Sequence, residues 1–229
     1  MPGECPFCAM HDNLEHYAID FLMGSSVGYM ESDIRMKTNK TGFCKKHYSK
    51  LFHSQNHLGL ALMLHTHLKE IIKSFDSMSD SVAKEKKSFF RRENQKSEIS
   101  EYYENLENSC FVCDMIDNSY EHYINTFFML FEKEQEVREK LKNTAGFCLG
   151  HFAMILDVAP KKLSNKALNA FYEIVIPLQK TNLNRLEQEL DWFTKKFDYR
   201  FNDEPWKTSK DAVERAIAKI ASLRVREKN

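Results

Sequence analysis

The six cysteines are the residues whose types and spacing most clearly predict chemistry in this chain. They fall into two sets with nearly the same layout, and none is left over. In each set a Cys-x-x-Cys pair is followed by Gly-Phe-Cys-x-x-His, with 35 residues between the second and third cysteines in the first set and 34 in the second. The two sets are Cys5, Cys8, Cys44 and His47, and Cys110, Cys113, Cys148 and His151.

Metal binding accounts for this layout. A Cys-x-x-Cys turn can aim two thiolates at one point about 2.3 Å away, and a Cys and a His three residues apart share one face of a helical turn. Each Gly-Phe can turn the chain into a helix start, whose positive end favours a thiolate. Three thiolates and one imidazole form the Cys₃His set of structural zinc sites. The sequence therefore predicts two zinc ions, one for each consecutive set, with no open position for catalysis.

Two other kinds of chemistry remain open at this point. Thiolate-rich sites also hold iron, so an iron-sulfur cluster is an alternative cofactor. A thiol-redox role for Cys5 and Cys8 is another, because Cys5-Pro6-Phe7-Cys8 resembles the Cys-Pro-aromatic-Cys motif of glutaredoxins. That motif normally follows a strand, which is not predicted here, and the second copy has Phe111 in place of the proline.

The similarity between the two sets extends to the residues between their motifs. His16-Tyr17 parallels His122-Tyr123, and Arg35 parallels Arg138 ahead of each Gly-Phe-Cys. This pattern predicts an internal duplication.

Helical periodicity dominates the segments that would position these motifs. Apolar residues recur at helical spacing over residues 14–23 and 120–128, after His47, over 58–75 and from Lys166 to Phe197. Pro177 should bend the last of these, because proline removes a backbone donor. We expect a mainly α fold of two tandem metal-stapled helical repeats plus long C-terminal helices, with little or no sheet.

The predicted organisation follows the motifs along the chain. We expect a first Cys₃His repeat, a charged and partly helical connector, a second Cys₃His repeat, and a C-terminal helical segment that packs on the repeats. Their bounds are 1–76, 77–106, 107–160 and 161–229. Thr208 and Asp211 fit a capping pattern ahead of a final amphipathic helix.

The segment from Lys196 to Trp206 is unusually rich in aromatic and charged residues. Tyr199, Arg200 and Trp206 are of types that anchor interfaces, which makes them a possible contact surface. A turn that holds the final helix against the body is the preferred interpretation.

Composition limits the classes of partner. Lys+Arg and Asp+Glu number 33 each, so no overall positive charge favours nucleic acid or an anionic membrane. No segment approaches the roughly 20 apolar residues of a membrane span, and no leader pattern opens the chain. We expect a cytoplasmic protein with a protein partner and no membrane partner. Nucleic-acid binding remains an alternative that the neutral charge disfavours.

The paired motifs, the stretch from Leu58 to Leu68 and the segment from Lys196 to Trp206 resemble an uncharacterised bacterial family of unknown function. The resemblance spans nearly the whole chain and implies one architecture for these features, but it implies no activity. From the residues themselves we expect a non-enzymatic, zinc-stabilised adaptor or regulator that acts through protein contacts.

Overall fold

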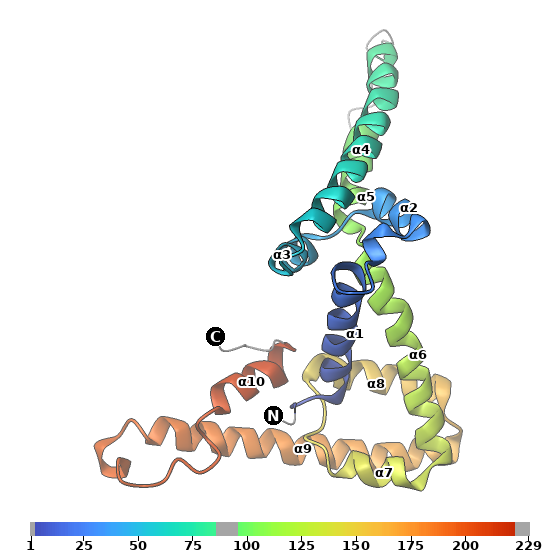
Figure 1. The fold of residues 1–229 in the computed structure, drawn as a ribbon. Helices are drawn as coiled ribbons and strands as arrows, with labels where there is room; N and C mark the ends of the chain where they lie inside the picture. Colours follow the sequence, from blue (N-terminus) through green and yellow to red (C-terminus); the bar gives the residue numbers. More distant parts are fainter. Residues whose placement is uncertain (1–2, 86–95, 223–229) are drawn as a thin grey trace. The chain divides into compact units, whose positions relative to one another are not determined.

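The computed structural model describes residues 3–85 and 96–222, and their regular structure is helical throughout, with no strand in those ranges (Figure 1). The predicted mainly α fold is confirmed. Part of the predicted connector, residues 86–95, lies outside the described residues. The elements are α1 (Pro6–Met23), η1 (Gly28–Met30), α2 (Ser32–Thr41), α3 (Lys45–His53), α4 (His57–Glu85), α5 (Glu98–Asn108), α6 (Phe111–Lys133), α7 (Gln135–Lys142), α8 (Leu149–Lys162), α9 (Asn165–Lys195), η2 (Tyr199–Phe201) and α10 (Ala212–Ala221).

The chain forms two compact units, and neither is one consecutive segment. Unit 1 combines Met1–Asp12 with Tyr120–Asn229, and unit 2 is Asn13–Ser119. This division differs from the predicted order of a repeat at residues 1–76 and another at 107–160, because α1 and α6 each run from one unit into the other.

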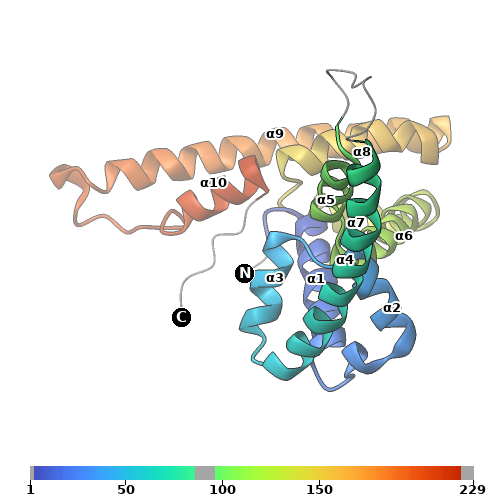
Figure 2. The same ribbon diagram turned by 90° about the horizontal axis from the view of Figure 1, so that it is seen from above.

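Unit 1 has an aromatic core beside its long C-terminal helix. Phe128, Phe131 and Phe147 pack in one buried cluster with Phe171 of α9. Helix α9 continues through Pro177 as one helix of 31 residues, and α10 packs along it, as Figure 2 shows from above.

The final helix therefore docks on this unit as the sequence predicts, although it begins later than the proposed cap. Asp211 is its N-cap residue without a side-chain cap bond, and Thr208 donates to Glu189 instead.

Unit 2 is built around α4, which packs against α2, α3 and α5. Its core includes Leu22 of α1, Leu51 of α3, Met63 of α4 and Val112 of α6, all essentially inaccessible to solvent. Because Leu51 of α3 and Val112 of α6 are buried in this one core, both helices begin in unit 2.

The two Gly-Phe-Cys turns have the geometry that their sequence predicts. Gly42 and Gly146 have φ of 57° and 72°, a region that side chains with a Cβ rarely adopt. Cys44 is then the N-cap residue of α3, and Cys148 that of α8. Both turns therefore deliver a cysteine to the positive end of a helix.

Candidate metal centres

The eight predicted ligands form two quartets, but not the two that their order in the sequence suggested. The unit 1 quartet is Cys5, Cys8, Cys148 and His151, and the unit 2 quartet is Cys44, His47, Cys110 and Cys113. The predicted pairing of each Cys-x-x-Cys with the next Cys-x-x-His is therefore wrong. Each Cys-x-x-Cys pair meets the Cys-x-x-His of the other set.

The helices between the motifs explain the exchange. After Cys8, α1 continues to Met23 and so carries the chain roughly 22 Å along its axis, whereas α2 has only ten residues, or about 15 Å, for a return. After Cys113, α6 continues to Lys133, roughly 30 Å, and α7 offers only about 12 Å. In both halves the second helix is shorter than the first, so it cannot by itself return the chain to the level of the preceding Cys-x-x-Cys pair.

The donor atoms in each quartet are spaced as a tetrahedral ion requires. In unit 1 the Nδ1 atom of His151 lies 3.4, 3.3 and 3.1 Å from the Sγ atoms of Cys5, Cys8 and Cys148. The Sγ atoms of Cys8 and Cys148 are 3.6 Å apart. Ligands of a zinc ion at about 2.0–2.3 Å are separated by roughly 3.5 Å, so this quartet could hold one metal ion.

The unit 2 quartet repeats this arrangement. Nδ1 of His47 lies 3.3, 3.1 and 3.4 Å from the Sγ atoms of Cys44, Cys110 and Cys113. The Sγ atoms of Cys44 and Cys113 are 4.0 Å apart. Cys44 and Cys113 are partly exposed, whereas all three cysteines of the unit 1 quartet are buried. This quartet too could hold a metal ion, in a less enclosed setting.

Charge distribution within the quartets favours one thiolate at each helix start. Hydrogen bonds from the Cys5 and Cys8 thiols, from His151 and from Ser222 hold the pKa of Cys148 far below its ordinary value. Burial would raise the pKa of Cys44, but the backbone N–H groups of α3 and the Cys110 and Cys113 thiols lower it. At Cys44 the backbone N–H groups at the start of α3 contribute to this lowering, whereas at Cys148 the side-chain hydrogen bonds account for it.

Cys8, Cys113 and His151 hold protons that a metal ion would displace. Hydrogen bonds to Cys148 and Cys5, together with burial, raise the pKa of Cys8. Burial, followed by the Cys110 thiol, raises the pKa of Cys113 to about 12. Burial would lower the pKa of His151, but its bonds to Cys148 and Cys5 raise it to about 9. Metal binding at these groups therefore releases protons.

Each histidine has a second partner that sequence analysis missed. Nε2 of His47 lies 3.0 Å from Oε1 of Glu15, and Nε2 of His151 lies 2.8 Å from the Tyr120 hydroxyl. Their matching positions in the two copies could have identified both residues, because Glu15 follows Cys8 by seven residues and Tyr120 follows Cys113 by seven. Aligning the copies on His16 and His122 instead concealed this equivalence.

Helix α10 closes the unit 1 quartet. The Ser222 hydroxyl donates to Sγ of Cys148 at 3.0 Å. Lys219, which is fully buried, donates to the carbonyl of Glu4 at 2.7 Å and to that of Ala145. Since Glu4 precedes Cys5 and Ala145 opens the turn to Cys148, one ammonium group ties together the two segments that supply the sulfurs.

The predicted contact residues of the Lys196 to Trp206 segment have different surroundings. Trp206 packs on Phe193, with ring centroids 5.7 Å apart, while Arg200 pairs with Asp198. Lys196 is buried and donates to the carbonyls of Phe201, Asn202 and Glu204. These contacts favour the interpretation as a structural turn. Tyr199, by contrast, is 84% exposed.

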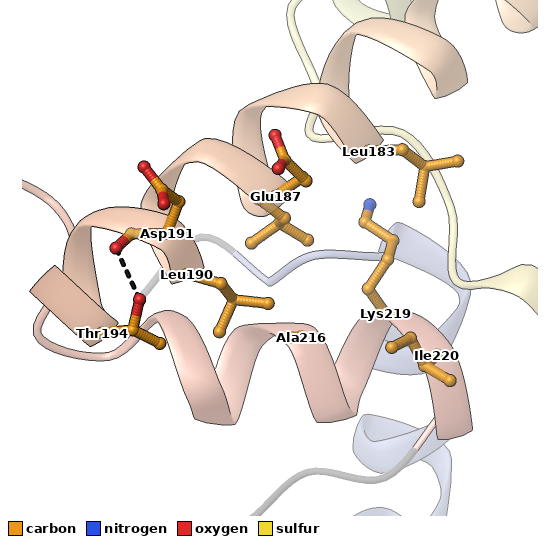
Figure 3. A pocket seen from close by; sticks show the side chains of 9 residues that line it. Leu183, Glu187, Leu190, Asp191, Thr194, Ala216, Lys219 and Ile220 are labelled. Carbon is orange, nitrogen blue, oxygen red and sulfur yellow. Dashed lines mark hydrogen bonds between the residues drawn. The ribbon is translucent and has the colours of Figure 1, made fainter.

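A groove between α9 and α10 has an apolar floor and acidic residues at its rim (Figure 3). Its volume is about 360 Å³. Leu183, Leu190 and Ile220 project into it, and Glu187 and Asp191 lie on α9 beside them (Figure 3).

No helix within residues 3–85 and 96–222 combines the length and the apolar run that crossing a membrane would require. No curated protein and no solved structure matches the chain. A family of unknown function, DUF6062, matches it over residues 1–227, and the chain therefore belongs to that family.

Proposed function

We propose that the protein binds two zinc ions, one in each quartet, and that both ions are structural. The observation that carries this proposal is the convergence of three sulfurs and one imidazole nitrogen within 4.8 Å of one another in both units. Three thiolates and a neutral imidazole match the closed structural sites of zinc, in which four protein ligands leave no position for substrate.

Metal analysis of the full chain, purified without added metal, tests this proposal. The expected result is a colourless protein with two zinc ions per chain. A brown protein that contains iron and sulfide would instead indicate iron-sulfur clusters, and a metal-free, fully folded protein would contradict metal binding altogether.

We further propose that the protein is a non-enzymatic adaptor or regulator that acts through protein contacts in the cytoplasm. Closed zinc sites stabilise a fold rather than perform a reaction, which favours a binding role. The groove between α9 and α10 supports this role, because an apolar floor beside Glu187 and Asp191 suits an amphipathic helix with basic residues.

Site-specific photo-crosslinking tests the contact role. A photoreactive amino acid at Ile220, on the groove, is expected to capture a protein that the same probe at Met36 does not capture. Met36 is a matched control because both side chains are 63% exposed and Met36 lies on α2 of unit 2. Equal capture at both positions would argue against a specific surface.

A further inference from the structure

We infer that Glu15 and Tyr120 are positioning residues of the two metal centres, an inference that rests on the proposed binding of zinc by the quartets. Each holds one histidine so that its Nδ1 atom points at the metal position. Neither residue belongs to a quartet, and each reaches the ring nitrogen that the sulfurs do not face.

The geometry fixes which ring nitrogen carries the hydrogen. In both histidines Nδ1 faces three sulfur atoms at 3.1–3.4 Å, so its lone pair is the one available to a metal ion. Nε2 must then carry the hydrogen and donate it to Glu15 in one unit and to Tyr120 in the other. Such a bond from a metal-binding imidazole orients the ring and increases its basicity.

The carboxylate of Glu15 is itself firmly held. Its side chain is only 5% exposed, and Lys46 and Lys50 pair with its two oxygens, with a distance of 2.7 Å from Lys46 to Oε1. Lys46, His47 and Lys50 all lie on α3, so one carboxylate receives three side chains of the helix that supplies two ligands. Loss of Glu15 would leave both the ring and two ammonium groups without this partner.

Tyr120 has the same position in α6, seven residues after Cys113, that Glu15 has in α1 after Cys8, but its hydroxyl group is neutral. Its hydroxyl bonds to His151, whose Nδ1 atom lies 3.4, 3.3 and 3.1 Å from the sulfurs of Cys5, Cys8 and Cys148, all of which would be thiolates around a metal ion. Within residues 3–85 and 96–222, no lysine or arginine bonds to Tyr120, whose hydroxyl pairs with His151. A carboxylate at this position would therefore face thiolates without compensation, whereas a phenol accepts the Nε2 hydrogen at no cost in charge.

The two centres are thus built on one plan with different second partners. A Cys-x-x-Cys pair at the start of each of the helices α1 and α6 belongs to one quartet, and the residue seven positions after its second cysteine is the partner of the histidine in the other quartet. Replacing Glu15 should therefore weaken only the unit 2 quartet, which contains His47. Replacing Tyr120 should weaken only the unit 1 quartet, which contains His151.

The test uses the zinc-loaded full chain with the variants Glu15→Ala, Glu15→Gln and Tyr120→Phe. Chelator competition should show one zinc ion bound about 10 to 100-fold more weakly in Glu15→Ala and Tyr120→Phe, with the other unchanged. Glu15→Gln should lie between wild type and Glu15→Ala, because its amide oxygen still accepts a hydrogen bond. Asp20→Asn and Tyr123→Phe are matched controls, since both side chains are exposed on the same two helices.

Nuclear magnetic resonance of the imidazole Nε2–H groups separates positioning from general stability. Hydrogen exchange of this group should accelerate at His47 alone in the Glu15 variants and at His151 alone in Tyr120→Phe. If Glu15→Ala does not fold, zinc affinity and Nε2–H exchange in Glu15→Gln and Tyr120→Phe still test the positioning role. Wild-type protein without zinc would overturn the proposed function, whereas two zinc ions with unchanged affinity and exchange in every variant would overturn only the positioning role.

Discussion

Cys8 and Cys148 stand 140 positions apart in the chain, yet their Sγ atoms are 3.6 Å apart within one quartet. The equivalent pair in unit 2, Cys44 and Cys113, is separated by 69 positions and 4.0 Å. Neither predicted repeat therefore completes a quartet from its own four ligands. Each quartet forms only when distant parts of the chain meet, so metal binding at either quartet would be coupled to long-range folding.

Zinc stoichiometry in double variants distinguishes the exchanged pairing from the sequential one. Cys8→Ser with Cys148→Ser removes two ligands of one quartet and should leave one zinc ion per chain. Cys8→Ser with Cys44→Ser damages both quartets and should leave neither ion tightly bound. Elemental analysis after dialysis against a weak chelator measures both.

The sequential pairing gives the opposite pattern for these two proteins. It requires Cys8→Ser with Cys44→Ser to retain one ion and Cys8→Ser with Cys148→Ser to lose both. That outcome would contradict the geometry of the structure.

The eight candidate ligands could be identified from the sequence, but which of them lie together could not. Spacing alone singled out Cys44 and Cys148 as helix-start thiolates, because a Gly-Phe turn and a Cys-x-x-His step are local features. The pairing depends on helix length, and apolar periodicity predicts the first helix only over residues 14–23, whereas α1 begins at Pro6. That shift puts the first Cys-x-x-Cys pair at a helix start and separates it from Cys44.

Lys219 was not identified because its position is typical of a solvated helix face. Its ammonium group becomes buried only when α10 packs beside the segments of Glu4 and Ala145, a tertiary contact that no local pattern encodes. Glu15 and Tyr120 were missed for a related reason, since each serves a histidine that lies far away in the sequence.

Removal of Lys219 should destabilise unit 1 and loosen its metal ion. Lys219→Met leaves the carbonyls of Glu4 and Ala145 without this donor and reduces the positive charge beside the Glu4 carboxylate, which lies 3.3 Å from Nζ. We expect a loss of about 2–4 kcal/mol in the free energy of unfolding. Thermal denaturation and the rate of zinc release to a chromogenic chelator check this.

Lys210→Met serves as the control for that variant, because Lys210 is an exposed lysine in the loop before α10. Its melting temperature and zinc release should match those of wild type. If both variants release one zinc ion at the wild-type rate, Lys219 has no part in holding the unit 1 quartet closed.

The turn at Gly42 should not tolerate a side chain. A Cβ atom there would lie 2.5 Å from Nε2 of His67, and φ of 57° with ψ of −146° is a conformation that essentially only glycine adopts. Gly42→Ala should cost about 1–3 kcal/mol and weaken the unit 2 quartet, because the turn places Cys44. Chemical denaturation with a parallel zinc titration measures both effects.

Gly150→Ala is the matched control for the glycine variant. Gly150 lies in α8, where an added Cβ meets only Ser222 Oγ at 3.5 Å, an ordinary contact. Alanine is the better helix former, so this variant should be unchanged or more stable by about 0.5–1 kcal/mol. Equal destabilisation by both substitutions would show that the turn conformation is not the cause.

Acid should release the metal before it disrupts the Glu15 contacts. Zinc holds thiolates and a neutral imidazole, so protons compete with it increasingly as pH falls. Burial opposes ionisation of Glu15, but hydrogen bonds from Lys46 and Lys50 lower its pKa to about 2. A carboxyl group whose folded pKa is depressed contributes stability above its unfolded pKa of 4.5 and loses that contribution only as pH falls towards 2.

In a pH titration followed by zinc release and helical circular dichroism, zinc release should therefore begin at a higher pH than the loss of the Glu15 contribution. Simultaneous loss of zinc and of all helical structure only near pH 2 would contradict thiolate ligation, because no proton competition would have occurred at the sulfurs.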